Sequence, residues 1–210
     1  MTRFWMRQDL VVPHLVDYLT ERCGVREEDI TIVIANGTHI GGDEQELRTL
    51  VTDAVYDRVK VKNHDCEAKD LVYLGTTPHG TPVSIDRTAA EADLVVCLGA
   101  VTHHVMAGFG GGRKSILPGI SGRETIFHNH AFSLDAAQLR SNPAIGNGVL
   151  KGNPLHEDMC EAASLVNNLF MVNLVMNADM KLSYIFSGHY LTSWERACTA
   201  VDDIYRVDIP

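Results

Sequence analysis

Two kinds of chemistry meet in residues 103–130, which read HHVMAGFGGGRKSILPGISGRETIFHNH. The segment carries four histidines, His103, His104, His128 and His130, on either side of a glycine-rich run. Neutral imidazole is the commonest metal ligand in proteins and also exchanges protons near neutral pH. Glycine-rich loops that carry cations bind phosphate, because their N–H groups are uncovered. The segment therefore predicts a metal site, a nucleotide site, or both.

The glycine-rich run is not a P-loop. Lys114 and Ser115 fit the end of G-x-x-x-x-G-K-[ST], but Arg113 stands where the last glycine lets the backbone wrap the phosphates. The run GFGGGRK still offers several uncovered N–H groups and two cations. Ser121 and Glu124 predict a capped helix directly afterwards, and helix starts favour anions. We therefore expect an anionic ligand here, bound in a different way.

The spacing of His128 and His130, the two late histidines, limits how many ligands this segment can give to one metal ion. His128 and His130 are two residues apart on the predicted helix, so they point to different faces and cannot chelate one ion together. No H-E-x-x-H arrangement is present. At most one of the pair therefore binds a metal, with other ligands from elsewhere. Five further histidines are expected to be surface or capping residues: His14, His64, His79, His156 and His189.

Short apolar, β-branched runs alternate with helical patterns along the chain. This alternation predicts a single α/β domain over residues 1–210, with a mostly parallel sheet flanked by helices in a Rossmann-like three-layer arrangement. The expected strands are 30–35, 59–63, 71–77, 82–86, 93–100, 170–177 and 182–188, and the expected helices are 11–24, 43–59, 153–166 and 192–205.

The same pattern predicts a cleft. In parallel sheets, ligands bind at the carboxyl ends of the strands. His39 follows the strand at 30–35, and His104 follows the strand at 93–100. If these strands are neighbours, His39, His104, Lys114 and one of the late histidines line one cleft.

Three pairs of residues predict helix starts. Asp43 with Glu46 resembles a capping box, and so does Thr192 with Glu195. Asn153 is a favourable N-cap with proline at the first helical position. These pairs set the expected beginnings of three helices.

Composition narrows the class of protein. The chain has 210 residues, 45% of them hydrophobic and 21% charged, which is typical of a globular domain. The net charge of −9 argues against nucleic acid and anionic membranes as partners. No run of about 18 apolar residues occurs and the first ten residues lack an apolar core, so we expect neither a transmembrane helix nor a signal peptide. Five scattered cysteines fit reduced thiols, so we expect a cytoplasmic protein.

Several motifs together resemble the lactate racemase family, enzymes that use a nickel-pincer nucleotide. The resemblance covers nearly the whole chain. It rests on GTH at 37–39, the run at 103–119, NH at 129–130, GTPVSIDRTAAEADLVVCLG and GNPLHEDMCEAA. The spacing agrees as well, with ten residues from His104 to Lys114 and sixteen from Lys114 to His130.

The resemblance implies roles for individual residues. Lys114 would carry the cofactor, pyridinium-3,5-bisthiocarboxylic acid mononucleotide, through a thioamide, and His130 would be the protein ligand of nickel. His39 and His104 would be the two acid/base residues. The remaining cofactor contacts would come from the glycine run and from what is left of an upstream D-x-T-R motif: Gly110, Gly111, Gly112, Arg113, Thr2 and Arg3.

The resemblance also implies a reaction and partners. The family racemises or epimerises a small 2-hydroxy acid by reversible hydride transfer to the cofactor, with one histidine serving each enantiomer. Its partners would be the cofactor-synthesis enzymes and a second, C-terminal domain. We expect this chain to be an N-terminal fragment that lacks that domain. We therefore expect the isolated chain to lack activity, because an open cleft leaves the cofactor exposed to solvent.

Two other functions stay open. One is a metal-binding domain without catalysis, and the other is a metal-dependent hydrolase that uses His39 and His104 on zinc. Lys114 distinguishes the first alternative, since a scaffold has no reason to carry a covalent nucleotide. The second would need a further ligand that the sequence does not clearly provide.

Overall fold

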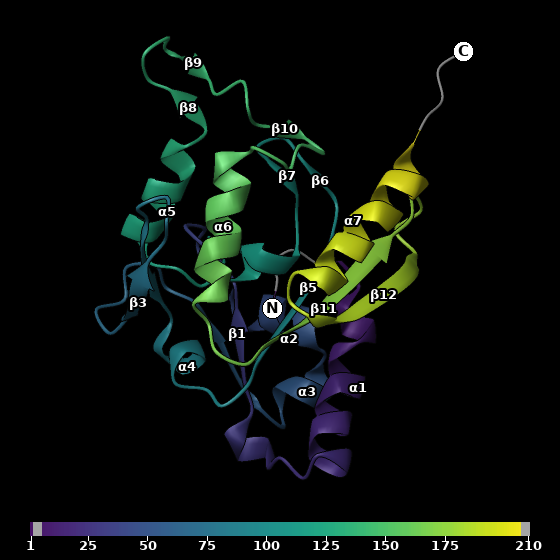
Figure 1. The fold of residues 1–210 in the computed structure, drawn as a ribbon. Helices are drawn as coiled ribbons and strands as arrows, with labels where there is room; N and C mark the ends of the chain where they lie inside the picture. The colour runs from purple at the N-terminus through teal and green to yellow at the C-terminus, as the bar shows by residue number, and fades with distance from the viewer. Residues whose placement is uncertain (2–5, 207–210) are drawn as a thin grey trace.

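The computed structural model describes Met1 and residues 6–206. Helices and strands alternate along the chain, which confirms the α/β class (Figure 1). The helices are α1 Val12–Asp17, α2 Glu44–Val51, α3 Asp53–Tyr56, α4 Arg87–Ala90, α5 Arg123–Ala131, α6 Pro154–Ser164 and α7 Thr192–Tyr205. The longer strands are β1 Thr31–Ile34, β2 Lys60–Asn63, β3 Val72–Thr76, β4 Pro82–Ile85, β5 Val95–Ala100, β11 Leu169–Met176 and β12 Leu182–His189. The shorter strands are β6 His103–His104, β7 Ala107–Phe109, β8 Leu134–Asp135, β9 Arg140–Ser141 and β10 Gly146–Asn147.

The strands form several small sheets rather than one mostly parallel sheet. β5 and β11 are parallel, but β12 runs antiparallel to β11 at the edge. β1 pairs in parallel with β2, and β3 pairs antiparallel with β4. The expectation of a single parallel Rossmann sheet is therefore not met. The physical reason lies in the connections, because short turns join β3 to β4 and β11 to β12, and a parallel pair needs a long crossover.

Helices cover both faces of the sheet formed by β5, β11 and β12. Val172 and Leu174 of β11 are buried against α1, α2 and α3. Met171 packs into the core that includes α6, and Val175 packs against α7. Figure 1 shows α7 lying along β11 and β12. Burial on both faces explains why β11 is apolar at every position except Asn173, rather than alternating.

Two of the four predicted N-caps are confirmed. The Glu46 N–H donates to Asp43 Oδ1 at 2.9 Å, and the Asp43 N–H donates to Glu46 Oε2 at 3.2 Å. Asn153 caps α6, with Pro154 at its first position. The predicted helix at 43–59 is nevertheless interrupted by Thr52, whose φ of 76° ends α2 before α3 begins.

The other predicted caps are wrong. α7 begins after Leu191 and has no side-chain cap, so Thr192 and Glu195 form no box. α5 begins after Gly122, because the Ser121 hydroxyl donates instead to the Ile116 carbonyl at 2.8 Å. Both serine and threonine form local backbone hydrogen bonds readily, which is why such patterns mislead.

Two further findings concern membrane-spanning helices and disulfides. No helix in the described part of the chain is long and apolar enough to cross a membrane. All five cysteines are free thiols.

Candidate functional site

His104 ends β6 and faces a tight turn into β7. The pairing of His104 with Gly108 brings the turn back over the ring. Its Nδ1 accepts two backbone N–H groups, from Met106 at 3.2 Å and from Ala107 at 3.1 Å. Burial, followed by the positive charges of Lys114 and Arg113, lowers the pKa of His104 to about 4. The imidazole is therefore neutral at pH 7, with its proton on Nε2.

Lys114 lies close to His104 on the 3₁₀ turn Gly112–Ser115. The side chain is half-buried. Burial, and then the neighbouring Arg113 charge, lowers the pKa of Lys114 to about 8. A sizeable fraction of the amine is therefore neutral at physiological pH. A neutral amine is the form that attacks carbonyl or acyl groups.

His130 on α5 completes this group. Its Nδ1–H donates to the Ile126 carbonyl at 2.9 Å, one helical turn earlier. The lone pair of Nε2 is left available, which is the arrangement typical of histidine metal ligands. Burial lowers the pKa of His130, so the ring stays neutral. His128 is exposed, as expected from the different faces of the two side chains.

Arg113 points into the protein. Its side chain is 1% exposed and its guanidinium lies 4.0 Å from the Trp194 ring. It donates to the carbonyls of Ala107 at 2.6 Å and Phe109 at 2.8 Å. Its Nε donates to His156 Nδ1 at 3.2 Å. These contacts make Arg113 a support of the loop, and the predicted contact with a phosphate stays a prediction.

The glycines of the loop are required by close packing against neighbouring residues. Gly111 and Gly112 have φ of 64° and 53°, which favour glycine. A Cβ on Gly112 would lie 2.3 Å from Trp194 of α7, and one on Gly111 would lie 2.7 Å from the Ala100 carbonyl. The Trp194 indole N–H also donates to the Gly110 carbonyl at 2.9 Å. α7 thus presses directly on the loop that carries Lys114.

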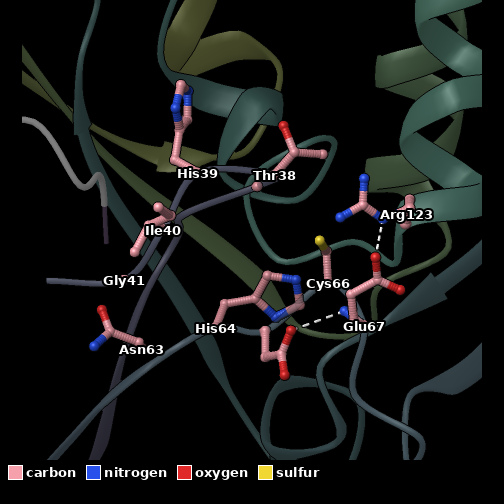
Figure 2. Close-up of a pocket in the computed structure, with 11 residues that line it drawn as sticks. Thr38, His39, Ile40, Gly41, Asn63, His64, Cys66, Glu67 and Arg123 are labelled. Carbon is pink, nitrogen blue, oxygen red and sulfur yellow. Dashed lines mark hydrogen bonds and ion pairs between the residues drawn. The ribbon is translucent and has the colours of Figure 1, made fainter.

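His39 lies apart from this group, on the loop after β1. It is exposed and lines a pocket of about 310 Å³. Figure 2 shows His39 and Arg123 on opposite sides of this pocket. His104, Lys114 and His130 do not line it. The strands before His39 and His104 are also not paired with each other in the described sheets, since β1 pairs with β2 and β5 pairs with β11, so the condition for a shared cleft is not met there.

Backbone hydrogen bonds connect the two regions. The Gly37 N–H, two residues before His39, donates to the Gly119 carbonyl at 2.9 Å. The Gly119 N–H in turn donates to the Lys114 carbonyl at 2.9 Å. The loop of His39 is therefore anchored to the segment that follows Lys114.

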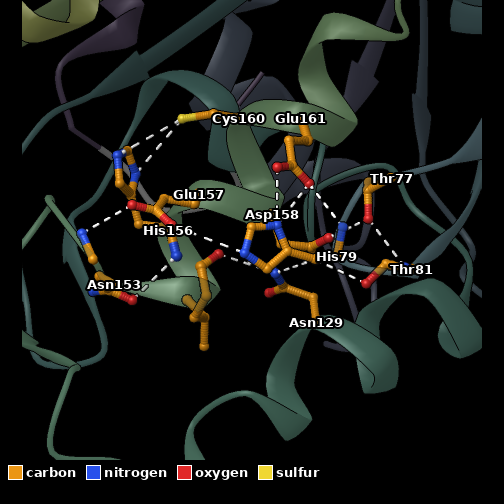
Figure 3. A network of polar contacts seen from close by, with 12 residues as sticks. Thr77, His79, Thr81, Asn129, Asn153, His156, Glu157, Asp158, Cys160 and Glu161 are labelled. Atoms are coloured by element: carbon orange, nitrogen blue, oxygen red, sulfur yellow. Dashed lines mark hydrogen bonds and ion pairs between the residues drawn. The ribbon is translucent and has the colours of Figure 1, made fainter.

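A different group of residues has metal-ligand spacing. Among the described residues, the ligand atoms of His79, Asp158 and Glu161 lie within 4.8 Å of one another. Figure 3 shows the His79 ring between Glu157 and Glu161. Nδ1 of His79 lies 2.8 Å from a carboxylate oxygen of Glu161, and this hydrogen bond raises the pKa of His79. This geometry is that of an imidazolium held by carboxylates, and it includes neither His39 nor His104.

The buried carboxylate of Asp158 is satisfied by neutral donors. It accepts from the hydroxyls of Thr77 at 2.5 Å and Thr81 at 2.9 Å. It also accepts from Nδ2 of Asn129 at 2.8 Å. The network fastens α5 and the β3–β4 turn to α6.

Three residues were misjudged or missed by the sequence analysis. His64 and His156 are buried rather than on the surface, being 3% and 8% exposed. Burial, followed by the Arg113 charge, lowers the pKa of His156 to about 3. Asn153 was expected only as a cap, yet it also reaches the turn beside His104.

Thr2 and Arg3, which were predicted to contact the cofactor, lie outside the described residues.

Comparison with known proteins identifies the family. The sequence pattern of the lactate racemase N-terminal domain matches residues 1–141. The chain belongs to this family. It is 33% identical over 200 residues to the lactate racemase of Thermoanaerobacterium thermosaccharolyticum, a match that covers 95% of this chain and 45% of that protein. It is 31% identical over 179 residues to the lactate racemase of Lactiplantibacillus plantarum, covering 85% and 41%. The match to the family therefore covers most of the chain. The chain spans less than half the length of these two relatives.

Solved structures agree with this assignment. The lactate racemase apoprotein of Thermoanaerobacterium thermosaccharolyticum superposes with a TM-score of 0.86 at 32% identity, covering 95% of this chain and 46% of that one. A protein from Thermotoga maritima gives a TM-score of 0.80 at 23% identity over the whole chain and 55% of its own, and shows the fold alone. The solved lactate racemase apoprotein therefore shares the fold of this chain over 95% of the chain's length.

Proposed function

We propose that the protein takes part in racemising or epimerising a small 2-hydroxy acid, with a nickel-pincer nucleotide held at Lys114. The observation that carries the proposal is the grouping of His104, Lys114 and His130 in a chain related to lactate racemases. Burial lowers the pKa of each of the three, which favours the neutral form of both imidazoles and makes the Lys114 amine partly neutral at physiological pH.

The residues present fit the cofactor. Lys114 offers an amine that is partly neutral at physiological pH, as attachment through a thioamide requires. His130 offers Nε2, because its Nδ1–H is already committed to Ile126. Lys114 would hold the nucleotide covalently, and His130 would be the protein ligand of its nickel. When bound, the group supplies an acceptor that takes a hydride from carbon and returns it.

The chain's own residues would handle the substrate's oxygen. His104 and His39 are proposed to act on the hydroxyl group from different sides, one for each enantiomer. A neutral imidazole suits this task near neutral pH. The anchoring of Gly37 to Gly119 ties the position of His39 to the Lys114 segment. The full reaction, its 2-hydroxy acid and the contribution of a C-terminal domain are part of this proposal, since the relatives are about twice as long.

The test is the intact mass and nickel content of the chain produced together with cofactor-synthesis enzymes. We expect a mass increase equal to the nucleotide and about one nickel per chain, both lost in Lys114→Ala. Lys151→Ala, which removes an exposed lysine, serves as the matched control and should load normally. His130→Ala should keep the added mass but lose nickel. An unmodified mass from a folded, co-expressed chain would refute the proposal and favour a metal-binding domain without catalysis.

A further inference from the structure

Asn153 has a second task besides capping α6. It is fully buried, and its Oδ1 accepts the His156 N–H at 3.2 Å as the cap requires. Its Nδ2 donates to the carbonyls of Met106 at 2.8 Å and Val149 at 2.9 Å. Figure 3 includes Asn153 and His156 at the start of α6. One side chain therefore connects the helix start to the turn that follows His104.

The bond to Met106 fixes the orientation of a whole peptide unit. The Met106 carbonyl and the Ala107 N–H belong to one planar trans peptide, so they point in opposite directions. Because Asn153 holds the oxygen, the N–H is directed away from α6. That N–H donates to Nδ1 of His104 at 3.1 Å. The Met106 N–H donates to the same nitrogen at 3.2 Å.

Two donors on Nδ1 decide where the proton of His104 lies. A nitrogen that accepts N–H groups uses its lone pair, so the neutral ring carries its proton on the other nitrogen. Within the described part of the chain, Nε2 of His104 has no hydrogen-bond partner. The opposite tautomer would place Nδ1–H against both backbone N–H groups.

We infer that Asn153 is a positioning residue which, through the Met106–Ala107 peptide, holds His104 as the Nε2–H tautomer. His104 then offers a hydrogen-bond donor to the oxygen of a 2-hydroxy or 2-keto acid. In this tautomer His104 has no free lone pair, so His39 takes up the hydroxyl proton, and the base role that the proposed function gives to His104 requires its ring proton to move to Nδ1. The identity of the acceptor rests on the proposed function, whereas the tautomer depends only on the fold.

The arrangement also distinguishes His104 from His130. His130 donates from Nδ1 to a carbonyl, which leaves Nε2 as a lone pair for a metal. His104 accepts at Nδ1, which leaves Nε2 as a donor for an oxygen. The backbone groups that hydrogen-bond to Nδ1 therefore make Nε2 a donor in His104 and an acceptor in His130.

The test reads the tautomer directly in the chain without cofactor. We would label histidine with ¹⁵N and record two-bond ¹H–¹⁵N correlation spectra at neutral pH, assigning His104 by its loss in His104→Gln. Asn153→Ser keeps an N-cap residue but is too short to reach Met106. Asn142→Ser is the matched control, because Asn142 also donates to a carbonyl (Phe132, 2.9 Å) and accepts an N–H (Ala144, 2.9 Å).

We expect a single Nε2–H form of His104 in the unmodified chain and in Asn142→Ser. Asn153→Ser should show a mixture of both tautomers, even if both serine variants lose similar stability. Nδ1–H in the unmodified chain, or an unchanged single tautomer in Asn153→Ser, would overturn the inference. Asn153→Asp, which keeps the acceptor and removes the donor, replaces Asn153→Ser if the latter does not fold. The spectra do not depend on cofactor loading, so a failure of the proposed function would leave this result intact.

Discussion

Replacing Arg113 with lysine tests whether its guanidinium supports the loop from within. The substitution keeps the positive charge beside Trp194 but removes the planar fork that serves Ala107 and Phe109 together. An ammonium at the end of a flexible stem can serve one of these carbonyls and leaves the other unsatisfied. An apolar residue would be a poorer probe, since it would also relieve the cost of burying the charge.

The expected size follows from the contacts. Hydrogen bonds to a charged group contribute about 1.5–3 kcal/mol, and a buried acceptor left unpaired costs about 1–3 kcal/mol. The side chain is 1% exposed, so water cannot take over the lost bonds. We expect Arg113→Lys to lower the free energy of unfolding by about 3 kcal/mol. For a domain of this size, that corresponds to a fall in Tm of about 6–12 °C.

The assay is urea unfolding followed by circular dichroism, together with calorimetric Tm. Arg123→Lys is the matched control, because Arg123 is exposed and paired with Glu67 at the surface, where substitutions change stability by about 0.5 kcal/mol or less. If Arg113→Lys unfolded at the same urea concentration as Arg123→Lys, the guanidinium would not be locked in the interior. The prediction of a phosphate contact at Arg113 would then gain support instead.

Two further predictions concern the same region. Gly112→Ala should lower stability by about 2–4 kcal/mol, because its Cβ would overlap Trp194 at a φ of 53°. Gly152→Ala is the control, because Gly152 has a φ of 75° but open space around it, so the substitution should cost only the backbone strain of about 1–2 kcal/mol. If urea unfolding showed equal losses of stability in Gly112→Ala and Gly152→Ala, the overlap with Trp194 would not be the cause. The lowered pKa values of His104 and His156, about 4 and 3, predict that stability falls as the pH drops from about 6.5 towards 4, since the unfolded chain binds these protons first. His156→Gln should make that dependence shallower by up to about 1.4 kcal/mol per pH unit, and an unchanged slope would show that His156 is not buried in its neutral form.

Much of the local structure could be predicted because its causes are local. The capping box of Asp43 and Glu46 and the cap formed by Asn153 and Pro154 depend on residues within one helical turn. The caps expected at Ser121 and Thr192 failed because hydroxyl groups readily form other hydrogen bonds nearby. The hydroxyl of Ser121 is used by Ile116, and α7 starts without a side-chain cap.

The sheet shows the same division. The apolar runs that became β5 and β11 were recognisable as strands. Their partners were not, because strand order and direction depend on the connections and on which faces the helices cover. The antiparallel β12 could have been expected from the short turn before it.

The sequence by itself determined the family and the candidate residues, since the run around Lys114 and the spacing to His104 and His130 are matters of residue type and number. Only the tertiary structure decided what each side chain meets. Arg113 turned inward to backbone carbonyls, while the His104 and His130 rings received opposite hydrogen-bond partners at Nδ1. The physical reason is that a histidine's chemistry depends on which nitrogen carries the proton. That choice is made by backbone groups brought close only when the chain folds.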